Sequence, residues 1–167
     1  GTGLNATKCF AEKTIPRIAA HMKLPFKEAE NHFEAQAARD AAVEASGALK
    51  TVAVSLTKIA NDIRWLASGP RCGIGEIRIP AVQPGSSIMP GKVNPVIPES
   101  VIQAAAQVMG NDTTIAVAGA GGNFEINVTI PLIARNLLES IDLLTESANV
   151  LAEKCVAGIE ADREACE

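Results

Sequence analysis

The stretch Gly85-Ser86-Ser87-Ile88-Met89-Pro90-Gly91-Lys92-Val93-Asn94-Pro95 separates two long apolar-periodic segments and has no apolar period of its own. Its glycines allow close approach of the backbone, and its prolines stiffen the path. Serine, lysine and asparagine supply a nucleophile or base, a fixed cation and a neutral hydrogen-bonding group. This combination indicates a site for a small anionic substrate whose negative charge grows during reaction.

The segment before this stretch predicts one long helix from Asp40 to Ser68, because its apolar residues recur every three or four positions. Gly69 and Pro70 are expected to end it. The expected core-facing stripe comprises Val43, Leu49, Val52, Ala53, Leu56, Ile59, Ala60, Ile63 and Leu66. The positions expected to face away from the core are Glu44, Lys50, Lys58, Asp62 and Arg64.

Two more long helices are predicted after the stretch. The first begins at or shortly after Pro95 and ends near the glycines at 119, 121 and 122. The second begins near Ile130, with Pro131 in its first turn, and Gly158 can terminate it. Three long helices with a shared apolar pattern are typical of a helical bundle.

The rest of the chain predicts shorter elements. A helix is expected near residues 8–22, kinked or divided by Pro16, and a short helix within residues 31–39. Residues 71–84 read as loop, with a little extended structure at residues 76–79. A new element begins near residues 162–164. Because the chain starts in a loop and stops as an element begins, we expect a segment of a larger protein.

Composition supports a packed helical domain and excludes several classes of partner. The chain has 167 residues and is 47% hydrophobic but only 3% aromatic, so aliphatic residues and alanine must fill the core. The formal charge of −4, without long runs, argues against nucleic acid or an anionic membrane. No apolar stretch is long enough for a membrane helix. Trp65 and Phe124 are expected to pack rather than to stack on a ligand.

The cysteines and histidines do not predict a metal site. Cys9, Cys72, Cys155 and Cys166 form no C-x-x-C pair, and neither His21 nor His32 is spaced with them as zinc ligands. Free thiols in a reducing compartment are expected, and hence a cytoplasmic location.

On residue chemistry alone, the segment from Gly85 to Pro95 has a second interpretation. It is also consistent with a glycine- and proline-bounded connector in which Ser87 or Asn94 caps a helix. Both interpretations stay open at this level.

The stretch matches every fixed position of the pattern Gly-Ser-Ser-x-Met-Pro-x-Lys-x-Asn-Pro, so the chain resembles the fumarase/aspartase superfamily. Further segments resemble its class II fumarase branch: Gly1 to Asn5, Phe33 to Ala35, Gly47 to Lys50, Lys58 to Leu66, Ser68 to Arg71, Gly110 to Asp112, Gly122 to Val128, and Gly158-Ile159. Gly91 and Asn123-Phe124-Glu125 favour fumarase, whereas Asn111 to Thr114 and Leu151 to Cys155 are similar to aspartases.

The resemblance implies an all-α fold, a long-helix bundle that forms the central helical domain of this superfamily, truncated at both ends. Residues 1–158 would be that domain and residues 159–167 the start of a small C-terminal domain. It also implies no metal or organic cofactor, and a homotetramer whose active sites are shared between subunits.

Site roles follow from the same resemblance. Ser86 matches the base that removes a proton beside the substrate carboxylate, giving an enediolate-like intermediate. Lys92 matches a catalytic and substrate-binding residue, and Glu99 matches a glutamate that pairs with a catalytic histidine. Ser87, Val93 and Asn94 match substrate contacts. The general-acid histidine has no match at His21 or His32.

Three functions remain open from the sequence. The first is reversible addition of water to fumarate to give L-malate by the full-length protein, the chain alone being inactive without the histidine. The second is the loss of ammonia from aspartate. The third is a non-catalytic helical interaction module, against which the intact Ser86, Lys92 and Asn94 argue.

Overall fold

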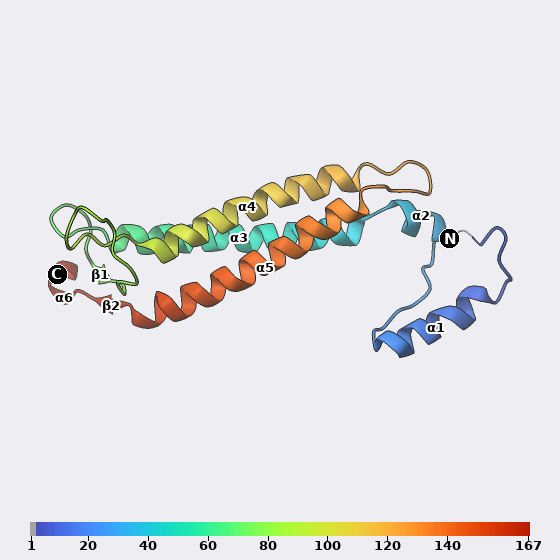
Figure 1. Ribbon diagram of the computed structural model, residues 1–167, viewed down its shortest axis with the longest axis horizontal. Helices are drawn as coiled ribbons and strands as arrows, with labels where there is room; N and C mark the ends of the chain where they lie inside the picture. Colours follow the sequence, from blue (N-terminus) through green and yellow to red (C-terminus); the bar gives the residue numbers. More distant parts are fainter. Residues whose placement is uncertain (1–2) are drawn as a thin grey trace.

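Three long helices, packed side by side, dominate the structure, a computed structural model that describes residues 3–167 (Figure 1). Gly1 and Thr2, from the expected glycine-rich start, lie outside the described residues. The elements in chain order are α1 (Phe10–Met22), α2 (His32–Ala37), α3 (Asp40–Leu66), β1 (Ile77–Arg78), α4 (Val96–Gly119), α5 (Ile130–Lys154), the 3₁₀ helix η1 (Val156–Gly158), β2 (Glu160–Ala161) and α6 (Arg163–Cys166). The predicted all-α bundle of long helices is confirmed.

The core lies between α3, α4 and α5. Small residues on α3, Ala53 and Ala60, are fully buried and allow close approach of α4. The largest fully buried apolar side chains include Val101, Val108 and Ile115, all on α4. Each such side chain stabilises the fold by about 1.5–3 kcal/mol relative to an exposed one. The helix α4 is therefore the central element of this bundle.

Two polar residues that follow one another on α4 are also buried, and each faces a different neighbour. Asp112 accepts hydrogen bonds from Ser46 Oγ, at 2.8 Å, and from Lys50 on α3. Asn111 donates to Ser140 Oγ on α5, at 3.1 Å. Burial raises the pKa of Asp112, but the hydrogen bonds from Lys50 and Ser46 outweigh it and hold that pKa below its usual value. The bundle is thus held by a polar layer as well as by apolar packing.

Some expected side-chain positions are wrong. Lys50 was predicted to face away from the core, yet it bonds to the buried Asp112. Val52 and Ile59, expected in the core stripe, are 48% and 45% exposed because the apolar stripe of α3 is wider than the surface that α4 and α5 cover. Trp65 and Phe124, expected to pack, are 66% and 94% exposed in this chain.

Helix boundaries follow the proline and glycine signals with one exception, at Gly158. Pro131 lies in the first turn of α5, as expected. Pro16 lies inside α1 without dividing it. Gly158 does not end α5, which stops at Lys154 before the 3₁₀ turn. The proposed division of the chain at residue 158 stays a prediction.

Different elements lie at the two ends of the bundle (Figure 1). At one end lie α1, α2 and the loop between α4 and α5. At the other end, the long loop between α3 and α4 meets the C-terminal residues, where β1 pairs antiparallel with β2. Residues 85–95 lie at this second end. No helix within residues 3–167 combines the length and apolar character needed to cross a membrane.

Candidate active site

Residues 85–94 form a loop closed by hydrogen bonds between its two ends. The Gly85 N–H donates to the Lys92 carbonyl, at 2.7 Å, and the Asn94 amide donates back to the Gly85 carbonyl, at 3.1 Å. A Cβ at position 85 would lie 2.6 Å from the Lys92 oxygen, so only glycine permits this approach. Asn94 therefore helps to hold the two ends of the loop together, and this closed part, Gly85 with residues 92–94, is called the neck of the loop.

The tip of the loop turns sharply. Gly91 has φ +78, a left-handed conformation that glycine adopts without steric penalty. The Lys92 N–H donates to the Met89 carbonyl across this turn, at 3.3 Å. The turn brings the Lys92 side chain back toward the start of the loop.

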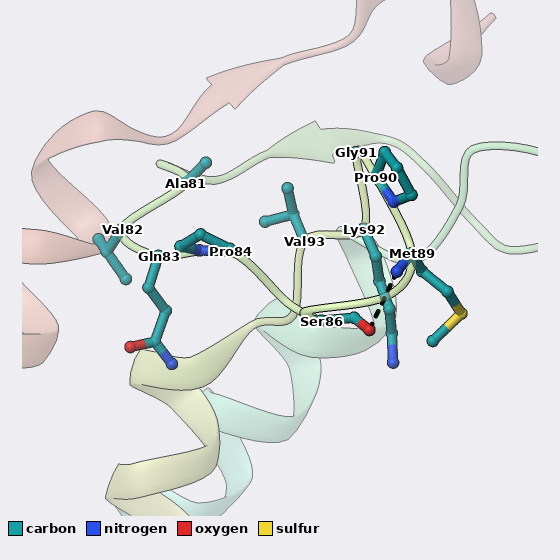
Figure 2. Close-up of a pocket in the computed structure, with 10 residues that line it drawn as sticks. All are labelled: Ala81, Val82, Gln83, Pro84, Ser86, Met89, Pro90, Gly91, Lys92 and Val93. Carbon is teal, nitrogen blue, oxygen red and sulfur yellow. Dashed lines mark hydrogen bonds between the residues drawn. The ribbon is translucent and has the colours of Figure 1, made fainter.

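Ser86 is half-buried, and its oxygen faces two backbone donors. The N–H groups of Ile88 and Met89 donate to Ser86 Oγ, at 3.2 and 3.3 Å. Figure 2 shows the Ser86 hydroxyl directed at the Met89 N–H, with the Lys92 side chain beside it. Donors aimed at one oxygen stabilise negative charge on it, as in an oxyanion hole. The geometry suits a serine that carries alkoxide character.

A hollow of about 480 Å³ opens on this side of the loop. Its lining consists of Ala81, Val82, Gln83, Pro84, Ser86, Met89, Pro90, Gly91, Lys92 and Val93 (Figure 2). Of the residues predicted for the site, Ser86, Lys92 and Val93 meet here. Ser87 is exposed, and neither it nor Asn94 belongs to this lining.

The capping interpretation of the loop is wrong in its detail. Helix α4 begins after Pro95 without a side-chain cap, so neither Ser87 nor Asn94 caps it. The Asn94 carbonyl instead accepts the Val96 N–H, at 2.8 Å. The polar side chains of the loop organise the loop itself.

Glu99 lies in the first turn of α4, directly after the loop but outside the lining of the hollow. Its carboxylate lies 3.8 Å from Arg64 Nη2 at the end of α3. This ion pair joins the last turn of α3 to the first turn of α4.

Histidines are remote from the hollow in this chain. His32 bonds to Glu28, at 2.9 Å, on the α2 side of the molecule, and no histidine lines the hollow among residues 3–167. All four cysteines are free thiols, as expected, and burial raises the pKa of Cys155. The described residues contain no cluster of three or more His, Cys, Asp or Glu side chains suited to a metal.

Four of the ten residues that line the hollow were not expected from the sequence. Ala81 to Pro84 form the wall opposite the signature residues, and nothing in their residue types marks them. The donor role of Ile88 and Met89 was also missed at the level of named residues, although glycine and proline around them indicated free N–H groups.

Comparisons with known proteins cover nearly the whole chain. A family model described as Lyase matches residues 1–110. The chain is 59% identical over 165 residues to "Fumarate hydratase class II" of Mycobacterium tuberculosis, covering 98% of this chain and 35% of that protein. It is 61% identical over 160 residues to the protein of the same name in Neisseria meningitidis, covering 96% of this chain and 35% of that protein.

A solved structure agrees with these sequence matches. The crystal structure of class II fumarase from Schistosoma mansoni superposes with a TM-score of 0.92 at 42% identity. The match covers 99% of this chain and 38% of that chain. The chain therefore spans about a third of the length of the relatives it matches.

Proposed function

Because the chain belongs to the lyase family whose model matches residues 1–110, we propose that the full-length protein is a class II fumarate hydratase. It would add water reversibly to fumarate to give L-malate. The matched relatives carry that name, and the hollow at the Ser86 loop offers the chemistry that the reaction needs. Aspartate ammonia-lyase activity is the alternative, which the named relatives do not favour.

Ser86 is the base in this proposal. A serine hydroxyl is a weak base unless its alkoxide is stabilised. The N–H groups of Ile88 and Met89, which donate to Ser86 Oγ, supply that stabilisation. In the dehydration direction, the Ser86 alkoxide takes the proton from the malate carbon next to a carboxylate, and the electron pair of the C–H bond passes into that carboxylate.

Proton removal leaves an enediolate-like intermediate with extra negative charge. Lys92 lines the same hollow, and its ammonium group stabilises the negative charge of the intermediate. One preorganised donor of this kind typically lowers a barrier by about 3 kcal/mol. The resemblance assigns Ser87 and Asn94 to substrate contact, but their positions suggest other roles. Asn94 donates to the Gly85 carbonyl and so closes the loop, and Ser87 is exposed outside the lining of the hollow.

The hydroxyl leaves as water once a general acid protonates it. We assign this acid to a histidine outside the described residues, paired with Glu99 as the resemblance implies. A homotetramer that shares its active sites between subunits would bring this histidine close to Ser86. The chain alone would then be inactive. The absence of a required cofactor and the cytoplasmic location also stay predictions.

The single observation that carries the proposal is the pair of N–H donors on Ser86 Oγ beside Lys92. The test is to measure fumarate formation, by its ultraviolet absorbance, from malate and from aspartate with the full-length protein. Turnover of malate alone supports the proposal. Turnover of aspartate alone would establish the ammonia-lyase, and no turnover of either would favour an interaction module.

A further inference from the structure

The C-terminal residues fold back onto the chain just before the hollow. Strand β1 pairs with β2 through Ile77↔Ala161 and Arg78↔Glu160. The Asp162 N–H donates to the Glu76 carbonyl, at 2.8 Å. Arg78 Nη2 donates to Asp162 Oδ2, at 2.6 Å, and this hydrogen bond lowers the pKa of Asp162. Segments about eighty residues apart in sequence are thus joined next to the candidate site.

One contact in this junction is unusually close. A Cβ built on Gly158 would lie 2.4 Å from Cγ of Pro80. The φ of Gly158 lies outside the left-handed region, so the backbone conformation itself would accept alanine. The pyrrolidine ring of Pro80 is rigid and cannot swing aside as a flexible side chain could. Glycine is required at position 158 because of Pro80.

Pro80 leads directly into the wall of the hollow. Ala81 follows it, and residues 81–84 line the hollow opposite Ser86 and Lys92. On the inner side, Ile77, Ile79 and Ile159 pack against the core cluster that includes Val101 and Leu151. Only five residues separate Pro80 from Ser86, and the rings of Pro80 and Pro84 fix the backbone φ at two points of this segment. The residues before it pack on the core of the bundle.

We propose that Gly158 is a positioning residue. Because it has no side chain, Pro80 can pack against the C-terminal turn, which is η1 (Val156–Gly158), and this contact fixes the position of residues 81–84 relative to Ser86. The inference rests on the proposed function for its catalytic readout. A methyl group at position 158 must push Pro80 by about 1 Å to reach ordinary contact. Displacements of that size can reduce turnover about 100-fold.

The experiment is a double-mutant cycle in the full-length protein with malate as substrate. Gly158→Ala is expected to lower kcat/KM by about 10- to 100-fold. Pro80→Ala removes the ring atoms and keeps only Cβ, which lies 3.7 Å from the added methyl group, an ordinary contact. In the Pro80→Ala background, Gly158→Ala should therefore have little effect. Gly47→Ala on α3 is the matched control, because no described atom beyond the adjoining backbone of its own helix lies within 4 Å of the added methyl group.

Two results would overturn the inference while leaving the proposed function intact. One is wild-type kcat/KM in Gly158→Ala, even with a lower melting temperature, since the contact would then be structural only. The other is an equal loss with and without the Pro80 ring, which would place the effect elsewhere.

A second readout keeps the inference testable if wild-type protein fails to turn over malate, which would refute the proposed function. Trypsin cuts after exposed lysines, and Lys92 is exposed on the loop. Cleavage after Lys92 should be faster in Gly158→Ala and return to the Pro80→Ala rate in the double variant. Equal cleavage rates in wild type and Gly158→Ala would contradict the inference.

Discussion

Gly85 provides the sharpest test of the loop geometry, because its replacement by alanine places one methyl group at a known position. The added Cβ would lie 2.6 Å from the Lys92 carbonyl oxygen, 3.0 Å from its carbon and 3.1 Å from the Asn94 nitrogen. All three are backbone atoms, so no side chain can move to relieve the overlap. The neck of the loop must open.

The size of that opening sets the expected loss. Ordinary contact begins near 3.4 Å, so the neck opens by about 0.8 Å. The Gly85–Lys92 hydrogen bond, 2.7 Å long, would stretch beyond the usual range and be lost. Ser86 is the next residue, and a misplacement near 1 Å can cost about 100-fold in rate, or roughly 2.7 kcal/mol of transition-state stabilisation.

The assay is the initial rate of fumarate formation from malate by full-length Gly85→Ala and by Gly47→Ala as the matched control. We expect kcat/KM to fall about 100-fold in Gly85→Ala only, with the assembly and the melting temperature close to wild type. Wild-type kcat/KM in Gly85→Ala, in a variant shown to be folded, would refute the reasoning that the closed neck positions Ser86.

Three further predictions concern the bundle that supports the loop. Asp112→Asn should lower the free energy of unfolding at pH 7 by about 1–3 kcal/mol, because the negative charge that Lys50 pairs with is lost and an NH₂ group replaces one of the two oxygens that accept from Ser46 and Lys50. Since the folded pKa of Asp112 is lowered, its stabilisation is present above the unfolded pKa of about 3.9 and is lost as pH falls through the folded pKa. Urea denaturation of both proteins at neutral and acidic pH should therefore show a difference that shrinks in acid, and a constant difference would contradict this. Ile115→Ala, at a fully buried position, should cost about 2–5 kcal/mol by the same method, and a cost below about 1 kcal/mol would mean that the site is not core. Asn127→Ala should cost about 1–3 kcal/mol, because its buried amide donates to the Ala118 carbonyl at 3.2 Å and accepts the Thr129 N–H at 2.9 Å; an unchanged urea midpoint would argue against that role.

The long helices were predictable because apolar spacing and proline or glycine boundaries act locally. The segment predicted as residues 40–68 folds as α3 from Asp40 to Leu66, and Pro131 lies where a first-turn proline should. Which part of an apolar stripe is covered depends on neighbours, so Val52 and Ile59 were placed wrongly. A stripe shows that a face is apolar, and only the packed structure shows how wide the covered part is.

Long-range pairings were out of reach of sequence patterns. The partners Ser46 and Asp112 are 66 residues apart, and Arg78 and Asp162 are 84 apart. One signal was present, since Asn111 and Asp112 continue the helical spacing after Val108 and so fall on the buried face of α4. The signature residues of the hollow were predictable from their pattern, but the wall at residues 81–84 is set by the contact of Pro80 with the C-terminal turn.

The most direct measurement of the central claim is the turnover of malate by full-length Ser86→Ala, compared with Ser100→Ala. Ser100 is an exposed serine on α4 that lies outside the hollow, and its hydroxyl donates to the Ile97 carbonyl. If Ser86 is the base, its replacement should reduce kcat by about 10²- to 10⁴-fold without changing assembly or melting temperature, while Ser100→Ala keeps wild-type turnover. Wild-type kcat in Ser86→Ala would contradict the account.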